Sequence, residues 1–145
     1  MTTAFGAIVA AIKTALQVSP AVSAQVDRAR LRPVPESQET AVSIRLESAA
    51  AERFAILNGP TDWDTTILIE CYARSAGATQ TADVAVDALL GAVWARLALD
   101  STLGGLVMDL NPVSLEYDFD GKADDMACVT LGLRVLHRTN NPSLE

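Results

Sequence analysis

The sequence has few aromatic residues, few basic residues and no long apolar run. Aromatic residues make up 5% of the chain, and 11 basic residues stand against 18 acidic ones, for a net charge of −7. This balance argues against general nucleic-acid binding, because neutralising phosphates requires an excess of Lys and Arg. The longest apolar runs are far shorter than the roughly 20 residues that span a bilayer. Residues 1–16 have neither a basic start nor a small-residue cleavage site, so we expect no signal peptide and no membrane partner.

Motifs that would indicate catalysis are also missing. The chain contains no GxGxxG, P-loop, HExxH or GxSxG sequence. Cys71 and Cys128 stand in apolar alternating stretches without a CxxC pair, which predicts two reduced core thiols in a cytoplasmic product. Glu70 and Cys71 are adjacent on an expected strand and therefore face opposite sides. His137 has no second histidine or motif partner, and it is predicted to be a surface residue at a strand end. We expect no enzyme, no metal and no cofactor.

Two helices are predicted from periodic apolar positions. The first covers residues 5–16, with Thr2 or Thr3 as its N-cap and Ser19-Pro20 after its end. The second runs from about Thr81 to about Leu99 and is followed by glycines suited to left-handed backbone. Its predicted core stripe is Ala85, Ala88, Leu89, Ala92, Val93 and Leu97.

Strands are predicted where apolar and polar residues alternate. In residues 41–47, Val42, Ile44 and Leu46 form the apolar side and the opposite side is expected to be wet. Residues 63–75 alternate with Cys71 on the apolar side, and residues 127–135 alternate in the same way. Residues 106–119 are extended, with Pro112 at an edge or a bulge. Residues 48–62 stay open between a helical turn and a further strand, with a turn at 58–60.

These elements predict one α+β domain over residues 1–145, although Leu144-Glu145 is typical of a cloning scar. Its sheet would have about four to six antiparallel or mixed strands, with both helices packed on one face and a long closing β-hairpin. The segment "YDFDGKADD" at 117–125 is the predicted turn of that hairpin. A calcium loop would place glycine at its sixth position and glutamate at its twelfth, but counting from Asp118 places Gly121 fourth and Val129 twelfth.

Two groups of residues are candidates for contacts with partners. Arg28, Arg30 and Arg32 recur at every second position, so an extended segment over 25–32 would present them on one side. They are either a solvated strand edge or a surface for an anion or a protein. In the second helix a further apolar row, Val86, Leu90 and Trp94, is either sunk against the sheet or left uncovered for a neighbouring subunit.

The order of these parts resembles the tail terminator family of long-tailed bacteriophages and prophages, the minor tail protein U-like proteins. The resemblance runs from the first helix through "AVSIRLE", "ILIECYARS", "ADVAVDALLGAVWARL" and "LGGLVMDLNPVSLEYDFDG" to "CVTLGLRVLHRT". It implies a non-enzymatic virion tail protein that is made and assembled in the host cytoplasm. Members form hexameric rings that cap the tail tube, end its polymerisation and prepare head–tail joining. The implied partners are further copies of the chain, the tail tube protein and head–tail connector proteins.

Two other functions remain open from the residues alone. One is a small cytoplasmic ligand-binding or enzymatic α+β domain, which a pocket with convergent polar groups would support. The other is a phage neck or head–tail connector protein. The family resemblance marks no individual residue as functional, so the contact candidates rest on their own patterns.

Overall fold

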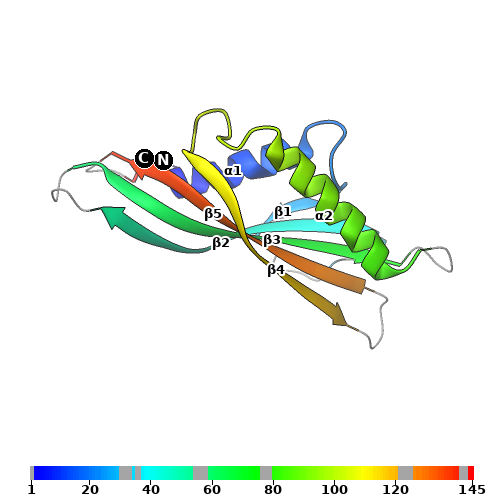
Figure 1. The fold of residues 1–145 in the computed structure, drawn as a ribbon. Helices are drawn as coiled ribbons and strands as arrows, with labels where there is room; N and C mark the ends of the chain where they lie inside the picture. Colours follow the sequence, from blue (N-terminus) through cyan, green and yellow to red (C-terminus); the bar gives the residue numbers. More distant parts are fainter. Residues whose placement is uncertain are drawn as a thin grey trace.

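The computed structural model describes residues 2–29, 34, 37–53, 59–75, 80–120, 126–140 and 144–145. In chain order its elements are α1 (Ala4–Gln17), β1 (Val26–Arg28), β2 (Thr40–Arg53), β3 (Thr61–Arg74), α2 (Ala82–Ala98), β4 (Asp109–Asp120) and β5 (Met126–Thr139). Both helices of the described chain lie on one face of a five-stranded sheet (Figure 1). The predicted α+β class is confirmed. Neither of these helices is long and apolar enough to cross a membrane.

The described strands are arranged in the order β1-β2-β3-β5-β4. β1 is parallel to β2, and the other neighbouring pairs are antiparallel, so the sheet is mixed. β4 and β5 form the predicted closing hairpin, with Asp120 opposite Met126. Of the turn expected at 117–125, residues 117–120 belong to β4 instead, and residues 121–125 lie outside the described residues. The open question about residues 48–62 is answered in part: β2 continues to Arg53, and residues 54–58 lie outside the described residues.

The helices begin where the sequence predicted. Thr3 caps α1, since its Oγ1 accepts a hydrogen bond from the Gly6 N–H at 3.3 Å, and Thr81 precedes the first turn of α2. The predicted core stripe of α2 is wrong in part, because Ala88 and Ala92 are exposed. The larger aliphatic side chains face the sheet instead, and their burial removes more apolar area from water. The buried residues of α2 are Val86, Leu89, Leu90, Val93 and Leu97.

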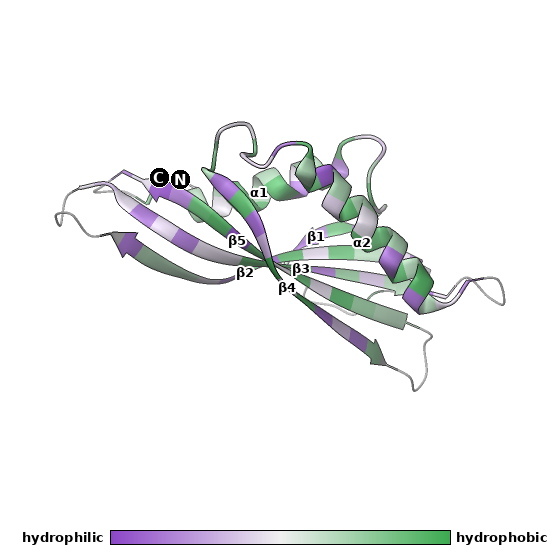
Figure 2. Ribbon diagram, viewed as in Figure 1, coloured by the Kyte–Doolittle hydropathy of each residue, from purple (hydrophilic) through white to green (hydrophobic). Residues whose placement is uncertain are grey.

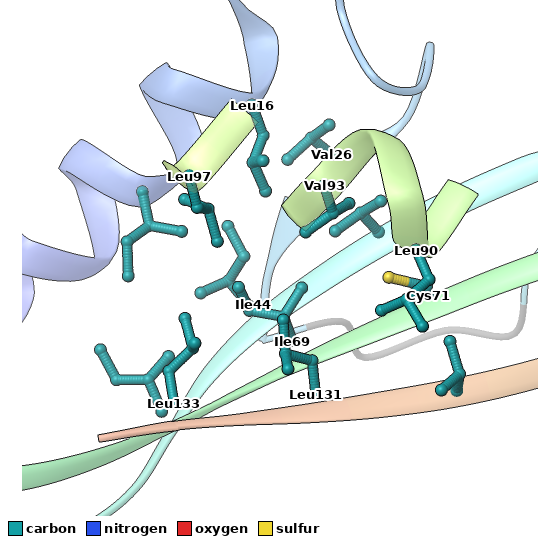
Figure 3. Close-up of a cluster of buried hydrophobic side chains, with 14 of the residues drawn as sticks. Leu16, Val26, Ile44, Ile69, Cys71, Leu90, Val93, Leu97, Leu131 and Leu133 are labelled. Carbon is teal, nitrogen blue, oxygen red and sulfur yellow. The ribbon is translucent and has the colours of Figure 1, made fainter. Parts of the chain in front are cut away.

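The core lies between the two helices and the inner face of the sheet, the face that carries them. Figure 3 shows side chains of α1 and α2 meeting those of β2, β3 and β5 in one cluster. Alternate residues of β3 from Thr65 to Ala73 are buried on this face, as predicted. Cys71 is among them, and burial raises the pKa of its thiol to about 12. Cys128 is half-buried and opposite Tyr72 on the outer face, so its assignment to the core was wrong.

Strand β2 departs from the predicted pattern of one wet and one dry face. Ser43 was expected to face water but is only 2% exposed, and its neighbours Ala41, Val42 and Ile44 are buried as well. This part of β2 lies between β1 and β3 and is covered on both faces. Leu46 was expected in the core but is exposed, because β2 has there run beyond the residues that pack under the helices.

The prediction that His137 lies on the surface is wrong. Its side chain is 1% exposed, and Nε2 lies 2.8 Å from Thr65 Oγ1. The Phe5 ring of α1 contacts the imidazole edge-on, with 4.9 Å between ring centroids, and also contacts Trp63 at 5.3 Å. The sequence predicted the strand end but not the aromatic side chain of α1 that covers it.

Candidate interaction surface

Strand β4 is an edge strand whose side chains are exposed on both faces from Asn111 to Phe119. The register with β5 shifts between Pro112 and Ser114, so Val113 is the extra residue of a β-bulge. Both alternatives predicted for Pro112, an edge and a bulge, are therefore found together. Gly132 of β5 lacks the side chain that would collide with Ser114, which lets β4 approach closely at this point.

Pairing with β5 determines which β4 side chains share the inner face. Leu115 is opposite Leu131, Tyr117 is opposite Val129, and Phe119 is opposite Ala127, and each of these β5 partners is buried. The β4 residues themselves are 45%, 51% and 55% exposed. The Tyr117 and Phe119 rings stack at 5.9 Å between centroids. These three residues, the β4 strip, are an apolar continuation of the core face that no described helix covers (Figure 2).

An apolar groove lies beside the strip, between α2 and β4. Its cavity volume is about 260 Å³, and its lining includes Trp94 and Leu97 of α2 together with Leu110 and Pro112 of β4. Trp94 is 45% exposed at the rim. With the β4 strip, it forms an exposed set of apolar side chains beside this groove. Such a patch is typical of an interaction site.

The structure separates the contact candidates of the apolar row. Val86 and Leu90 are buried in the core, whereas Trp94 is exposed. The row as a whole is therefore not an uncovered surface, and the reading of a helix sunk against its sheet holds for its first two members. The sequence could not make this distinction, because all three positions share one helical face.

Of the arginine candidates, Arg28 lies at the opposite edge of the sheet. Arg28 ends β1 and is exposed, and the next residue, Ala29, has a φ of 47° that ends the extended segment. The strand expected over 25–32 is therefore shorter than predicted, with three residues. Arg30 and Arg32 lie outside the described residues.

The outer face of the sheet, away from the helices, carries ion pairs. Arg45 of β2 pairs with Glu70 of β3 at 3.0 Å. Arg134 of β5 contacts Asp64 at 2.7 Å and Glu52 at 3.0 Å. β4 contributes only acidic charge to this face, from Asp109, Glu116 and Asp118. The described residues contain no group of three or more His, Cys, Asp or Glu side chains placed to hold a metal ion.

The described residues define an α+β sandwich in which β4 is a bare edge strand with an apolar surface beside it. No protein-family model matches the chain, and no curated protein matches it. Among solved structures, the chain is similar to one in the virion of a native gene transfer agent particle. The TM-score is 0.58 at 16% identity, covering 91% of this chain and 95% of that one. A sheath/tube terminator of an extracellular contractile injection system, in its extended state, matches with a TM-score of 0.40 at 13% identity, over 94% of this chain and 57% of that one. At these identities, the first likeness shows a shared fold.

Proposed function

We propose that this chain is a structural protein of a phage tail, in which an oligomeric ring of its copies caps the tail tube. In the family that this chain resembles, the ring is a hexamer. The ring would end polymerisation of the tube and prepare the tail for joining to the head. The observation that carries the proposal is the apolar surface of the β4 strip and Trp94, bare on a fold shared with a chain of a gene transfer agent virion. A protein that assembles into a particle needs surfaces for its neighbours, and an exposed apolar surface is removed from water when a neighbour binds to it.

A ring requires two different surfaces on each copy, since head-to-tail contacts are heterologous. The apolar surface at the β4 edge would be one, with Trp94 as an anchor. The opposite edge of the sheet, which carries Arg28, would contribute to the other, together with Arg30 and Arg32, which follow it in the sequence. Val86 and Leu90 would act from within, by holding α2 and hence Trp94 in place.

Tail-length control in the strain that encodes the chain tests this function. Deleting the gene should leave tails overlong or unjoined in electron micrographs, and restoring it should give tails of uniform length. Trp94→Ala should fold, because a half-exposed tryptophan costs less than the about 3–5 kcal/mol of a buried one. It should nevertheless fail to restore tail length.

Val84→Ala is the matched control, because Val84 is another exposed apolar residue of α2, near its opposite end. It should restore tail length fully. Normal tails in the deletion strain would refute the proposed function. Tails of normal length with Trp94→Ala would show that Trp94 is not part of the contact between copies.

A further inference from the structure

The geometry points to strand addition as the contact between copies. The free edge of β4 in one copy pairs antiparallel with the open half of β2, residues 45–53, in the next copy. The inference rests on the proposed function for its setting, a closed ring, while the pairing itself follows from the two sheet edges. It goes beyond the function by naming the two surfaces that meet and the residues that align them.

The open half of β2 exists because β1 is short. β1 pairs only with Val42–Ile44, and the Ala29 N–H donates to the Ile44 carbonyl oxygen at 2.8 Å. The positive φ of Ala29 ends the extended backbone of β1 at this point. From Arg45 to Arg53 this edge of β2 has no strand beside it within the described part of the chain. Unpaired N–H and C=O groups along such an edge are a template for another strand.

The strand directions fit a head-to-tail arrangement. β2 is antiparallel to β3, β3 to β5 and β5 to β4, so β2 and β4 run in opposite directions at opposite edges of the described sheet. A second copy in the same orientation therefore brings its β2 antiparallel to β4 of the first. Each copy uses both edges once, which is the heterologous contact that a ring requires.

One register matches both faces of the two strands. With Arg45 opposite Asp118, Leu46 falls opposite Tyr117 on the inner face. Glu47 is already the bulged residue of β2, so Ser48 then falls opposite Glu116 and Ala49 opposite Leu115. On the outer face this register adds a pair between Arg45 and Asp118. On the inner face, Tyr117 and Leu115 of the β4 strip lie opposite Leu46 and Ala49. Pairing ends before Pro112, which has no N–H to donate.

This register also sets how far neighbouring copies are displaced along the strand direction. Within one copy Arg45 is level with Ser114, through Leu68 and Gly132. Pairing with Asp118 displaces the next copy by four residues, or about 13 Å along the strands. Such a stagger accompanies the strand tilt that closes a sheet on itself. Pairing does not extend beyond Arg45 on this side, because β1 of the same copy already occupies the edge beside Ile44, with Arg28 opposite it, and Phe119 therefore stays outside the pairing.

Charge-reversal variants test the pairing. Arg45→Glu places two acidic side chains opposite each other at this pair, and Asp118→Arg places two basic ones there, so each variant alone should self-associate at least about tenfold more weakly than the parent. An equimolar mixture should recover association, because the reversed edges then alternate around the ring. Sedimentation velocity over a concentration series, with and without tail tubes from the deletion strain, measures this. Asp87→Arg, a charge reversal on the exposed side of α2, is the control and should associate like the parent.

A disulfide trap tests the register independently of charge. Ala49→Cys with Leu115→Cys, in a Cys128→Ser background, should give a covalent ladder on oxidation. Within one copy β3 and β5 separate the strands of the two positions by about 14 Å across the sheet, and the positions are also offset along the strands, too far apart for a disulfide. A ladder therefore reports contact between copies. Ala49→Cys with Asp87→Cys is the control pair and should stay monomeric.

The outcomes separate this inference from the proposed function. If the parent restores tail length, but the reversals associate normally and no ladder forms, strand addition is wrong and the function stands. If the ladder forms and the mixture recovers association, but the deletion strain has normal tails, the function is wrong and the contact stands. A cross-link from Leu115→Cys to the tube protein in place of a second copy would also overturn the inference.

Discussion

At the scale of single residues, His137 is a titratable side chain buried in the folded protein. It is buried between Phe5, Trp63 and Thr65, and no hydrogen-bond partner for Nδ1 is found in the described chain. Burial disfavours the imidazolium and lowers the pKa of His137 below its usual value of about 6.5. Well above pH 6.5 the side chain is neutral in both the folded and the unfolded state. As the pH falls, the unfolded state binds the proton first, and stability is lost.

We therefore expect the free energy of unfolding to fall between pH 7 and pH 5 by more in the parent than in a His137→Gln variant. Carboxylates titrate alike in both proteins, so the difference between the two pH profiles isolates the histidine. Denaturant titrations at a series of pH values measure it. Parallel profiles would mean that His137 is accessible to protons in the folded state.

At the scale of elements, Arg96 of α2 joins the two helices. Its Nη1 donates to the carbonyl oxygens of Ala15 at 3.0 Å and Val18 at 2.6 Å, and its Nη2 donates to that of Pro20 at 2.6 Å. The last carbonyl groups of an α-helix receive no hydrogen bond from an N–H group within the helix. A positive charge at this end of α1 also interacts favourably with the helix dipole. The guanidinium thus fixes where α1 ends and how it lies against α2.

Replacing Arg96 by Ala should lower the free energy of unfolding by about 1–3 kcal/mol, as is usual for charge-assisted hydrogen bonds. Arg96→Lys should recover only part of the loss, because one ammonium cannot reproduce the planar fork. Arg45→Ala is a useful comparison: its exposed pair with Glu70 should be worth about 1 kcal/mol or less. Equal losses for Arg96→Ala and Arg45→Ala in denaturant melts would show that the carbonyl contacts stabilise the fold no more than an exposed ion pair does.

The sequence predicted the elements better than their surroundings. Alternation in β3 and β5 correctly identified the inner face, because a strand's period fixes which side chains share a face. Alternation does not show how far the helices extend along that face, so Leu46 was predicted to lie in the core and His137 on the surface. The exposure of Trp94 but not of Leu90 was equally undetermined, since it depends on how α2 is rotated over the sheet and on where β4 begins. The apolar β4 strip was visible as alternation, but its bareness depends on the order of strands in the sheet.

At the scale of the whole molecule, the hydrophobic core and the proposed interface form one continuous apolar layer. Leu131 and Leu115 are opposite each other in neighbouring strands, one buried beneath α2 and the other on the bare edge. The same apolar residue type therefore contributes to folding at one position and remains available for association at the next. The net charge of −7 disfavours non-specific association between copies.

This division predicts opposite effects for the same substitution at the two positions. Leu131→Ala should lower the free energy of unfolding by about 2–5 kcal/mol, because it leaves a cavity in the core. Leu115→Ala should cost about 1 kcal/mol or less, because its side chain is already half in water. Self-association should instead weaken for Leu115→Ala, and it should be retained for Leu131→Ala at temperatures where that variant is folded. Chemical denaturation and sedimentation velocity on the same two proteins measure both quantities. A Leu115→Ala loss as large as that of Leu131→Ala would show that β4 is covered within a single copy, leaving no apolar edge for a neighbour to bind.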